Sequence, residues 1–405
     1  MQGRSGLRLP AAVVAAAFLA GALRPAGESG DRYLPWEGGA AYYKKWINGP
    51  PADAEFFPIS VWYQAAGNAA RYKAIGVNQY IGPVSRRPSE GLELLRQAGM
   101  ALIGSQSAAS LAGSEKDILR GWFLFDEPDN AQAKPGGGYG SCILPPALVQ
   151  QYQDVVAKDP TRPAFLNFGQ AVANEPWPGR GDACSGHYEH YPEYIEGADI
   201  VSYDVYPVNN GLPLWWVGKG VDRLREWAQY KKPVWDWIET TAYNAGPKPT
   251  PDDVKAEVWM SIIHGAMGVG YFCHVFKPVA DDAGPLDDAP MREALTAIDR
   301  QIEELAPALN TPSVANGVRA AASTSISGAP VETMLKRQGG ATYLFAMRSR
   351  PGSEATVEFT LRGAPREMTA SVLGEARTVR VKNGVFEDRF AGYQVHLYRL
   401  PFLPK

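Results

Sequence analysis

Two glutamates stand at the ends of apolar, aromatic-rich segments of this sequence. Glu127 ends the segment Gly121-Trp-Phe-Leu-Phe-Asp-Glu, and Glu239 ends the segment Pro233-Val-Trp-Asp-Trp-Ile-Glu. Both segments have the composition of buried strands, and removing a carboxylate from water costs several kcal/mol. We therefore expect the two acids to be aimed at one cavity.

The elements that must position these acids form a regular series. Short, continuous apolar runs alternate with helical segments, and continuous apolarity is typical of parallel strands covered on both faces. Eight such units over about 250 residues predict a (β/α)8 barrel. A doubly wound open sheet is the main alternative, but it carries a Gly-rich turn after its first strand, where this chain has Trp62-Tyr63-Gln64. The predicted strands are Phe56–Tyr63, Val77–Ile81, Ala101–Gly104, Gly121–Phe125, Ala164–Phe168, Asp199–Val205, Val234–Ile238 and Val269–Val275.

Beyond Leu309 the hydrophobic period changes to an alternation of apolar and polar residues. Turn sequences separate these segments, so the pattern predicts a small antiparallel β-sandwich. We place the barrel at 27–310 and the sandwich at 311–405. The predicted strands of the sandwich are Ala341–Arg348, Glu354–Leu361, Arg377–Lys382 and Tyr393–Arg399.

The N-terminus has the pattern of a secretory signal peptide. Arg4 and Arg8 precede an apolar run from Ala11 to Leu23 that is too short for a membrane span, and small residues follow it. Residues 1–26 are therefore expected to be removed from a secreted or periplasmic protein with no membrane span. The net charge of −3 gives no reason to expect a nucleic acid as partner. The oligomeric state stays open.

The cysteines and two neighbouring histidines favour structural roles. Cys273 lies in an apolar run, whereas Cys142 and Cys184 lie in irregular segments. In an oxidising compartment we expect a Cys142–Cys184 disulfide. A metal site is the weaker interpretation, because no Cys-x-x-Cys or His-x-x-x-His spacing accompanies them. His187 and His190 are interpreted as surface histidines.

The positions of the two glutamates in the barrel suggest their chemistry. Glu127 follows the fourth predicted strand and Glu239 the seventh, so the two carboxylates can face each other across a ligand. One carboxyl group can then protonate a glycosidic oxygen while the other attacks the anomeric carbon or activates water. This arrangement resembles clan A of the retaining glycoside hydrolases, with Glu127 followed by Pro and with an accessory sandwich.

The resemblance implies a role for each acid. Glu127 would be the acid/base and Glu239 the nucleophile of a double displacement that uses no metal or cofactor. Most of the clan has Asn before the acid/base, where this sequence has Asp126. An ionised aspartate accepts but cannot donate a hydrogen bond to a sugar hydroxyl, and its charge would raise the pKa of a neighbouring acid. Asp236 is the rival nucleophile, although it lies inside its strand.

Other polar and aromatic residues near the strand ends are candidates for sugar contacts. Asp204 or Tyr206 is also expected to orient Glu239. Trp177, Trp215 and Trp216 are further candidate stacking platforms. The predicted substrate contacts are Tyr63, Gln64, Gln79, Gln106, Asp126, Asn167, Tyr203, Asp204, Tyr206, Trp237 and His274.

The sequence thus predicts a secreted glycoside hydrolase that acts on an oligosaccharide or polysaccharide. One alternative is a non-catalytic carbohydrate-binding protein on a decayed barrel, and another is a metal-dependent hydrolase. The alternative to a catalytic role is a structural one, in which Glu127 and Glu239 each form a salt bridge at the barrel rim. The sugar, the linkage, exo or endo action and the role of the sandwich stay open.

Overall fold

Eight parallel strands close into a barrel in the structure, which is a computed structural model. It describes residues 31–83, 88–175, 177, 187–322 and 330–404. The strands follow one another around the barrel in chain order, and the last pairs with the first. They are β2 (Ile59–Trp62), β3 (Gln79–Ile81), β4 (Ala101–Ser105), β5 (Leu119–Asp126), β6 (Ala164–Phe168), β7 (Ile200–Asp204), β8 (Val234–Glu239) and β9 (Val269–Phe272).

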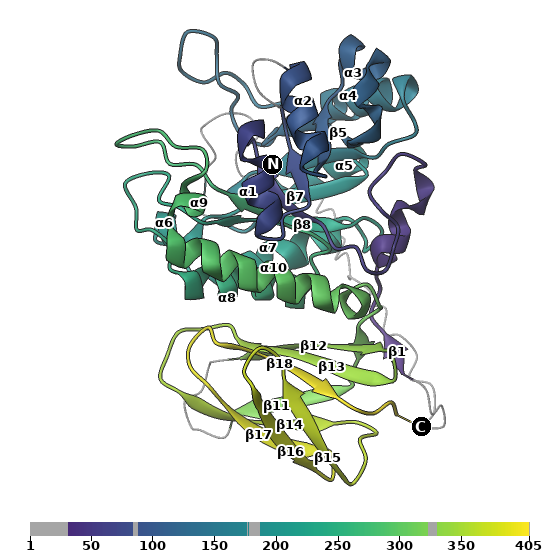
Figure 1. Cartoon of the computed structure of the whole chain (residues 1–405), viewed down its shortest axis with the longest axis vertical. Helices are drawn as coiled ribbons and strands as arrows, with labels where there is room; N and C mark the ends of the chain where they lie inside the picture. The colour runs from purple at the N-terminus through teal and green to yellow at the C-terminus, as the bar shows by residue number, and fades with distance from the viewer. Residues whose placement is uncertain (1–30, 84–87, 176, 178–186, 323–329, 405) are drawn as a thin grey trace, which may run out of the picture. The chain divides into compact units, whose positions relative to one another are not determined.

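Helices cover the outside of this barrel (Figure 1). They bury the outward faces of the strands, which explains why these strands are largely apolar on both sides. The α-helices are α1 (Ala69–Ala74), α2 (Pro88–Gln97), α3 (Ala108–Ala112), α4 (Pro145–Lys158), α5 (Tyr191–Glu196), α6 (Pro207–Asn210), α7 (Trp216–Trp227), α8 (Pro251–His264), α9 (Gly284–Asp287) and α10 (Ala289–Leu309). The 3-10 helices are η1 (Gly39–Lys45), η2 (Ala66–Asn68), η3 (Ser114–Asp117), η4 (Gln170–Val172) and η5 (Tyr188–His190).

The barrel interior is filled by large side chains. Phe165, Trp235 and Trp237 belong to one buried cluster, because inward positions recur at every second residue of a strand. Helix η1 adds Tyr43, whose hydroxyl accepts a hydrogen bond of 3.2 Å from the Trp235 indole. The interior of the barrel is therefore a packed core, and a cavity can form only at the carboxyl ends of the strands.

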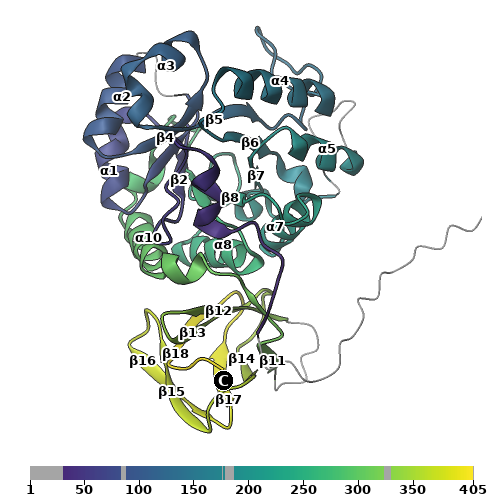
Figure 2. The ribbon, with the colours of Figure 1, turned by 90° about the vertical axis from the view of Figure 1, so that its right-hand side faces the viewer.

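The C-terminal strands form one antiparallel sheet of eight strands that encloses its own core (Figure 2). Strands at the two ends of the strand order contact each other, so the sheet folds into two layers as a β-sandwich. The strands are β11 (Val318–Ala322), β12 (Val331–Gln338), β13 (Ala341–Arg348), β14 (Ala355–Leu361), β15 (Glu367–Val372), β16 (Arg377–Lys382), β17 (Val385–Phe390) and β18 (Val395–Leu400). The short strands β1 (Arg32–Tyr33) and β10 (Val314–Ala315) pair separately.

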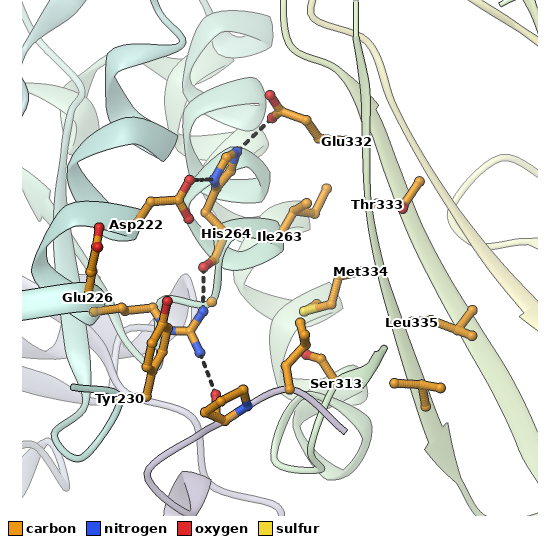
Figure 3. A pocket seen from close by; sticks show the side chains of 15 residues that line it. Asp222, Glu226, Tyr230, Ile263, His264, Ser313, Glu332, Thr333, Met334 and Leu335 are labelled. Atoms are coloured by element: carbon orange, nitrogen blue, oxygen red, sulfur yellow. Dashed lines mark hydrogen bonds and ion pairs between the residues drawn. The ribbon is translucent and has the colours of Figure 1, made fainter. Parts of the chain in front are cut away.

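The sandwich contacts the barrel through α8. The Phe345 ring stacks on Trp259, with ring centroids 5.8 Å apart. His264, at the end of α8, lies between Asp222 of α7 and Glu332 of β12 (Figure 3). Its Nδ1 is 2.8 Å from Asp222 Oδ2 and its Nε2 is 2.6 Å from Glu332 Oε2. A cavity of about 460 Å³ adjoins these groups.

The predicted barrel and sandwich are both confirmed, including the fourth and seventh strand positions of Glu127 and Glu239. The sequence prediction missed four strands of the sandwich, namely β11, β12, β15 and β17. The domain boundaries at 27–310 and 311–405 stay a prediction.

Two predictions concern residues that the structure does not describe. The signal peptide of residues 1–26 and Cys184 of the expected disulfide both lie outside the described residues, so both stay predictions. Cys273 is buried, as expected. Within the described part of the chain, every helix is too short or too polar to cross a bilayer.

Candidate active site

A cavity of about 480 Å³ opens at the carboxyl ends of the barrel strands. Three carboxylates, those of Asp126, Glu127 and Asp204, lie in its lining together with aromatic rings and amides. This is the end of a (β/α)8 barrel where catalytic groups are found. The lining residues are Trp62, Asp126, Glu127, Asn130, Tyr139, Gln170, Trp177, Asp204, Tyr206, Asn210, Tyr243, Phe272 and Phe276.

Glu127 occupies a constrained backbone position immediately after β5. Its φ of 46° lies in the left-handed region, which costs free energy for a residue with a side chain. The Glu127 N–H donates to the Asn167 carbonyl at 2.8 Å, and the Glu127 carbonyl accepts from the Asn130 N–H at 3.0 Å. These bonds fix the turn that points the half-buried side chain toward the cavity.

Gly169 leaves the room that the Glu127 side chain occupies. A Cβ atom on Gly169 would lie 3.1 Å from Glu127 Oε1 and 2.4 Å from Asn130 Nδ2. The Gly169 N–H donates to Asp129 Oδ1 at 3.0 Å, and Asp129 Oδ2 accepts from the Tyr191 hydroxyl at 2.7 Å. Burial raises the pKa of Asp129 to about 6, while these two donors oppose the rise. The wall behind Glu127 is thus built from glycine backbone and a buried, hydrogen-bonded acid.

Asn167 connects the other two acids of the cavity. Its Nδ2 amide donates to Asp126 Oδ1 at 3.1 Å and to Asp204 Oδ2 at 2.8 Å. Its Oδ1 accepts from Ser202 Oγ at 2.8 Å, and Ser202 Oγ accepts from the Trp237 indole at 3.0 Å. The network crosses the adjacent strands β5 to β8 and fixes the orientation of the Asn167 amide.

Asp204 is the acid whose protonation the site alters most clearly. Burial raises its pKa well above the usual range, and the negative charges of Glu127 and Asp126 raise it further. The hydrogen bond from Asn167 opposes this rise. A raised pKa favours the protonated form of a carboxyl group, which is the form that can donate a proton.

Glu239 lies next to this cavity but does not line it. Its side chain is fully buried, and its two carboxylate oxygens accept backbone N–H groups at the start of α6. The Val208 N–H donates to Oε1 at 2.6 Å and the Asn209 N–H donates to Oε2 at 2.9 Å. Burial raises the pKa of Glu239 to about 8, and the two amides oppose the rise. The structure therefore ties Glu239 to the β7–α6 connection.

The two glutamates share one neighbour, Tyr243. Burial is the largest cause that raises the pKa of the Tyr243 hydroxyl to about 12. The negative charges of Asp204, Glu239 and Glu127 act in the same direction. The Tyr243 ring contacts Tyr206 and Phe272, with ring centroids 5.3 Å and 5.6 Å apart. Glu239 and the cavity acids thus lie around one aromatic group.

Some of the residues predicted to contact a sugar line the cavity, and others lie away from it. Asp126, Asp204 and Tyr206 line the cavity, as does Trp177 among the candidate platforms. Asn167 does not line the cavity, but its side chain donates hydrogen bonds to Asp126 and Asp204, which do. Trp237 is buried in the barrel interior, and Trp215 and Trp216 pack near Lys219.

The remaining predicted contacts have other partners. Tyr63 stacks on Trp62, with ring centroids 4.7 Å apart, and the His274 Nε2 lies 3.1 Å from the Trp62 carbonyl. Gln64 bonds the Trp62 carbonyl and the Tyr72 hydroxyl, and the Gln106 amide donates to the Val155 carbonyl.

Gln79 and Tyr203 are displaced from the cavity by strand geometry. Gln79 is buried at the start of β3, near Ser60. Tyr203 points outward, because its neighbours Ser202 and Asp204 face inward. Its hydroxyl donates to the Val217 carbonyl and lies 3.4 Å from Asp236 Oδ2. Asp236, the rival nucleophile, also faces outward and is fully buried.

The sequence prediction missed most of the cavity lining. Trp62 and Phe272 end the first and eighth strands, so strand position alone could have identified them. The other missed residues lie on loops or on the short helices η4 and α6 within them, where no regular pattern places a side chain. They are Asn130, Tyr139, Gln170, Asn210, Tyr243 and Phe276.

Comparison with known proteins shows distant similarity to solved structures only. No protein-family model matches the sequence, and no curated protein matches it. A GH30 endoxylanase from Clostridium papyrosolvens is 10% identical, with a TM-score of 0.48 over 92% of this chain and 98% of that one. A maltogenic alpha-amylase from Thermotoga neapolitana is 10% identical, with a TM-score of 0.46 over 86% and 99%. An alpha-amylase from Geobacillus thermoleovorans is 10% identical, with a TM-score of 0.45 over 86% and 98%. Similarity at this level carries no argument about activity.

Proposed function

We propose that this chain is a glycoside hydrolase whose reaction centre is the cavity around Glu127. The observation that carries the proposal is the presence of Glu127 and Asp204 in one cavity at the carboxyl ends of the barrel strands, with aromatic rings beside them. Paired carboxyl groups perform the proton transfers of glycosidic cleavage, and aromatic faces bind the apolar faces of sugars. The substrate is an oligosaccharide or polysaccharide, β-linked as in the resembling clan, and the protein is exported.

In this proposal Glu127 is the acid/base. It gives its proton to the glycosidic oxygen as the bond to the anomeric carbon breaks, and it later takes a proton from the attacking water. Its constrained backbone and the space left by Gly169 support this role, because a proton donor must be held at a fixed position.

The second carboxylate is Glu239 if the enzyme retains configuration. Glu239 would attack the anomeric carbon and form a glycosyl ester, which water then cleaves. To reach the cavity its side chain must exchange the Val208 and Asn209 amides for the substrate. Asp204 already lines the cavity and is the competing partner of Glu127. With Asp204 as the second acid, the reaction would not pass through an ester on Glu239.

The test compares three variants on defined β-linked oligosaccharides. We expect Glu127→Gln to lower kcat/KM by at least about 100-fold, because it removes the proton donor. If Glu239 is the nucleophile, Glu239→Ala loses activity and added azide restores turnover as a glycosyl azide of inverted configuration. If Asp204 is the second acid, Asp204→Asn loses activity, and azide gives Glu239→Ala no such product. Glu358→Gln, an exposed acid on β14, is the matched control.

A binding function without hydrolysis is the second candidate. The observation that favours it is the engagement of Glu239 with two backbone amides away from the cavity lining. In that case wild type and all variants would show equal, null hydrolysis while sugar binding persists. Replacing Trp62, whose ring lines the cavity, by Ala would then weaken the binding. Measurable hydrolysis that depends on Glu127 would exclude this candidate.

A further inference from the structure

A cluster of potential metal ligands lies outside the cavity. His187, Glu189 and His190 each offer one ligand atom, and these three atoms lie within 4.8 Å of one another. They come from one short stretch of chain at η5, directly before α5. None of the three lines the cavity around Glu127.

The two imidazoles of the cluster lie against each other. The His187 and His190 rings are stacked, with centroids 4.9 Å apart and planes 14° apart. A neutral imidazole has a free lone pair, which is the form that binds a metal ion.

An ion pair explains only part of this cluster. His187 Nδ1 lies 2.7 Å from Glu189 Oε1, with both side chains exposed. His190 Nδ1 is buried and has no hydrogen-bond partner among the described residues. A buried polar atom without a partner calls for an explanation, and a metal ion bound by the cluster would supply a partner.

We infer that His187, Glu189 and His190 bind a divalent transition-metal ion, with Zn²⁺ as the best match. Two imidazoles and one carboxylate form a nitrogen-rich set that suits Zn²⁺ and its neighbours, whereas Mg²⁺ and Ca²⁺ prefer oxygen alone. With three protein ligands, water completes a tetrahedral shell. The ligand atoms must contract from their present separation to meet the short bonds of Zn²⁺.

The position of the cluster indicates a structural role for the ion. Tyr191, the residue after His190, donates its hydroxyl to Asp129, and Asp129 accepts the N–H of Gly169 behind Glu127. The Tyr188 hydroxyl donates to the Glu175 carbonyl at 3.0 Å. An ion at η5 would therefore stabilise the outer support of the cavity wall. This inference is independent of whether the cavity hydrolyses a sugar.

The experiment is a Zn²⁺ titration of the tag-free chain by calorimetry, with Co²⁺ absorption as a report on coordination geometry. We expect one equivalent of Zn²⁺ per chain and a higher melting temperature in its presence, because the ion binds only the folded state. His187→Ala and His190→Ala should each weaken binding by at least about tenfold. Glu189→Gln, which keeps both imidazoles, should weaken it less than the double histidine variant.

The controls make the result decisive. Glu193→Gln removes an exposed acid of α5 that lies next to the cluster, and it should bind Zn²⁺ like the wild type. Circular dichroism establishes that each variant is folded. Absence of saturable Zn²⁺ binding by the wild type would overturn the inference. So would undiminished binding by the His187→Ala/His190→Ala double variant, which would put the ion elsewhere.

Discussion

Asn167 binds two acids of the cavity at the same time, so its substitution should affect both of them. Both protons of its amide nitrogen are used, one on Asp126 and one on Asp204. Asn167 is itself buried, so its amide has no solvent in place of these two acceptors. Removing a partner from a buried polar group costs the desolvation of that group.

We expect Asn167→Ala to lower the free energy of unfolding by about 2 kcal/mol, because it leaves Asp126, Asp204 and Ser202 without this partner. Urea denaturation measures the loss. Asn68→Ala is the control, since Asn68 has one long, exposed bond from Arg71. An equal effect of the two substitutions would contradict the role of Asn167.

Gly169→Ala tests the space behind Glu127. The added Cβ would meet Asn130 Nδ2 at 2.4 Å and Glu127 Oε1 at 3.1 Å, so both side chains must move. We expect the overpacking to lower the free energy of unfolding by about 1–3 kcal/mol. If Glu127 is the acid/base, hydrolytic activity should also fall, because the carboxyl group is moved from its position.

Gly67→Ala is a matched control for that substitution. A Cβ on Gly67 would meet nothing within 4 Å. Its stability and activity should stay close to those of the wild type. Retention of full activity by Gly169→Ala would show that the position of Glu127 does not depend on this contact.

At the scale of the elements, the alternation along each strand decides which residues reach the cavity. Ser202 and Asp204 of β7 face inward, whereas Tyr203 faces the helices. The same alternation points the Trp237 side chain into the core of the barrel, away from the cavity lining. Only the last inward position of a strand and the first residues of the following loop can contact a ligand.

The contact between α8 and β12 should depend on pH. Burial lowers the pKa of His264, but the hydrogen bonds that its ring donates to Asp222 and Glu332 outweigh this effect and raise the pKa to about 9. The folded state then binds this proton more tightly than the unfolded state does, so the contribution is full below about pH 6.5 and is lost as the pH rises through 9. It amounts to at most about 3 kcal/mol.

The measurement is the difference in unfolding free energy between wild type and His264→Gln at pH 6 and pH 9.5. We expect a larger difference at the lower pH. Using the difference removes groups common to both proteins, such as Lys336, whose pKa burial lowers to about 7 and whose effect has the opposite sign. A difference that does not change with pH would contradict the assigned protonation of His264.

At the scale of the whole molecule, the barrel and the sandwich share buried apolar surface. Met334, Phe345 and Leu397 of the sandwich belong to the same hydrophobic cluster as the outer face of the barrel. All eleven tryptophans precede residue 260, so the whole tryptophan emission comes from the N-terminal part of the chain. This distribution gives a direct measure of coupling between the two parts.

We expect Phe345→Ala to lower the stability by about 3–4 kcal/mol, because it removes a buried ring that stacks on Trp259. The urea midpoint followed by tryptophan emission should fall together with that followed by circular dichroism. Leu403→Ala, at an exposed position, is the control and should change neither midpoint. An unchanged emission midpoint in Phe345→Ala would show that the barrel unfolds independently.

The fold was largely predictable, because hydrophobic periodicity is a local property of the chain. Continuous apolar runs identified all eight barrel strands, and the position of Glu127 and Glu239 on strands four and seven followed from counting them. The sandwich was recognised from its clearest strands. Strand β12 was missed, since its Lys336 reads as a surface residue although it is buried and donates to the Leu309 carbonyl at 3.1 Å.

The sequence by itself determined the barrel, the sandwich and the presence of acids at the mouth. Only the tertiary structure decided which acids meet. It places Glu127 beside Asp126 and Asp204 in one cavity and turns Glu239 toward the amides of α6. The physical reason is that a strand pattern fixes the side of the sheet that a residue faces, whereas the direction of a carboxylate depends on donors from loops distant in the chain.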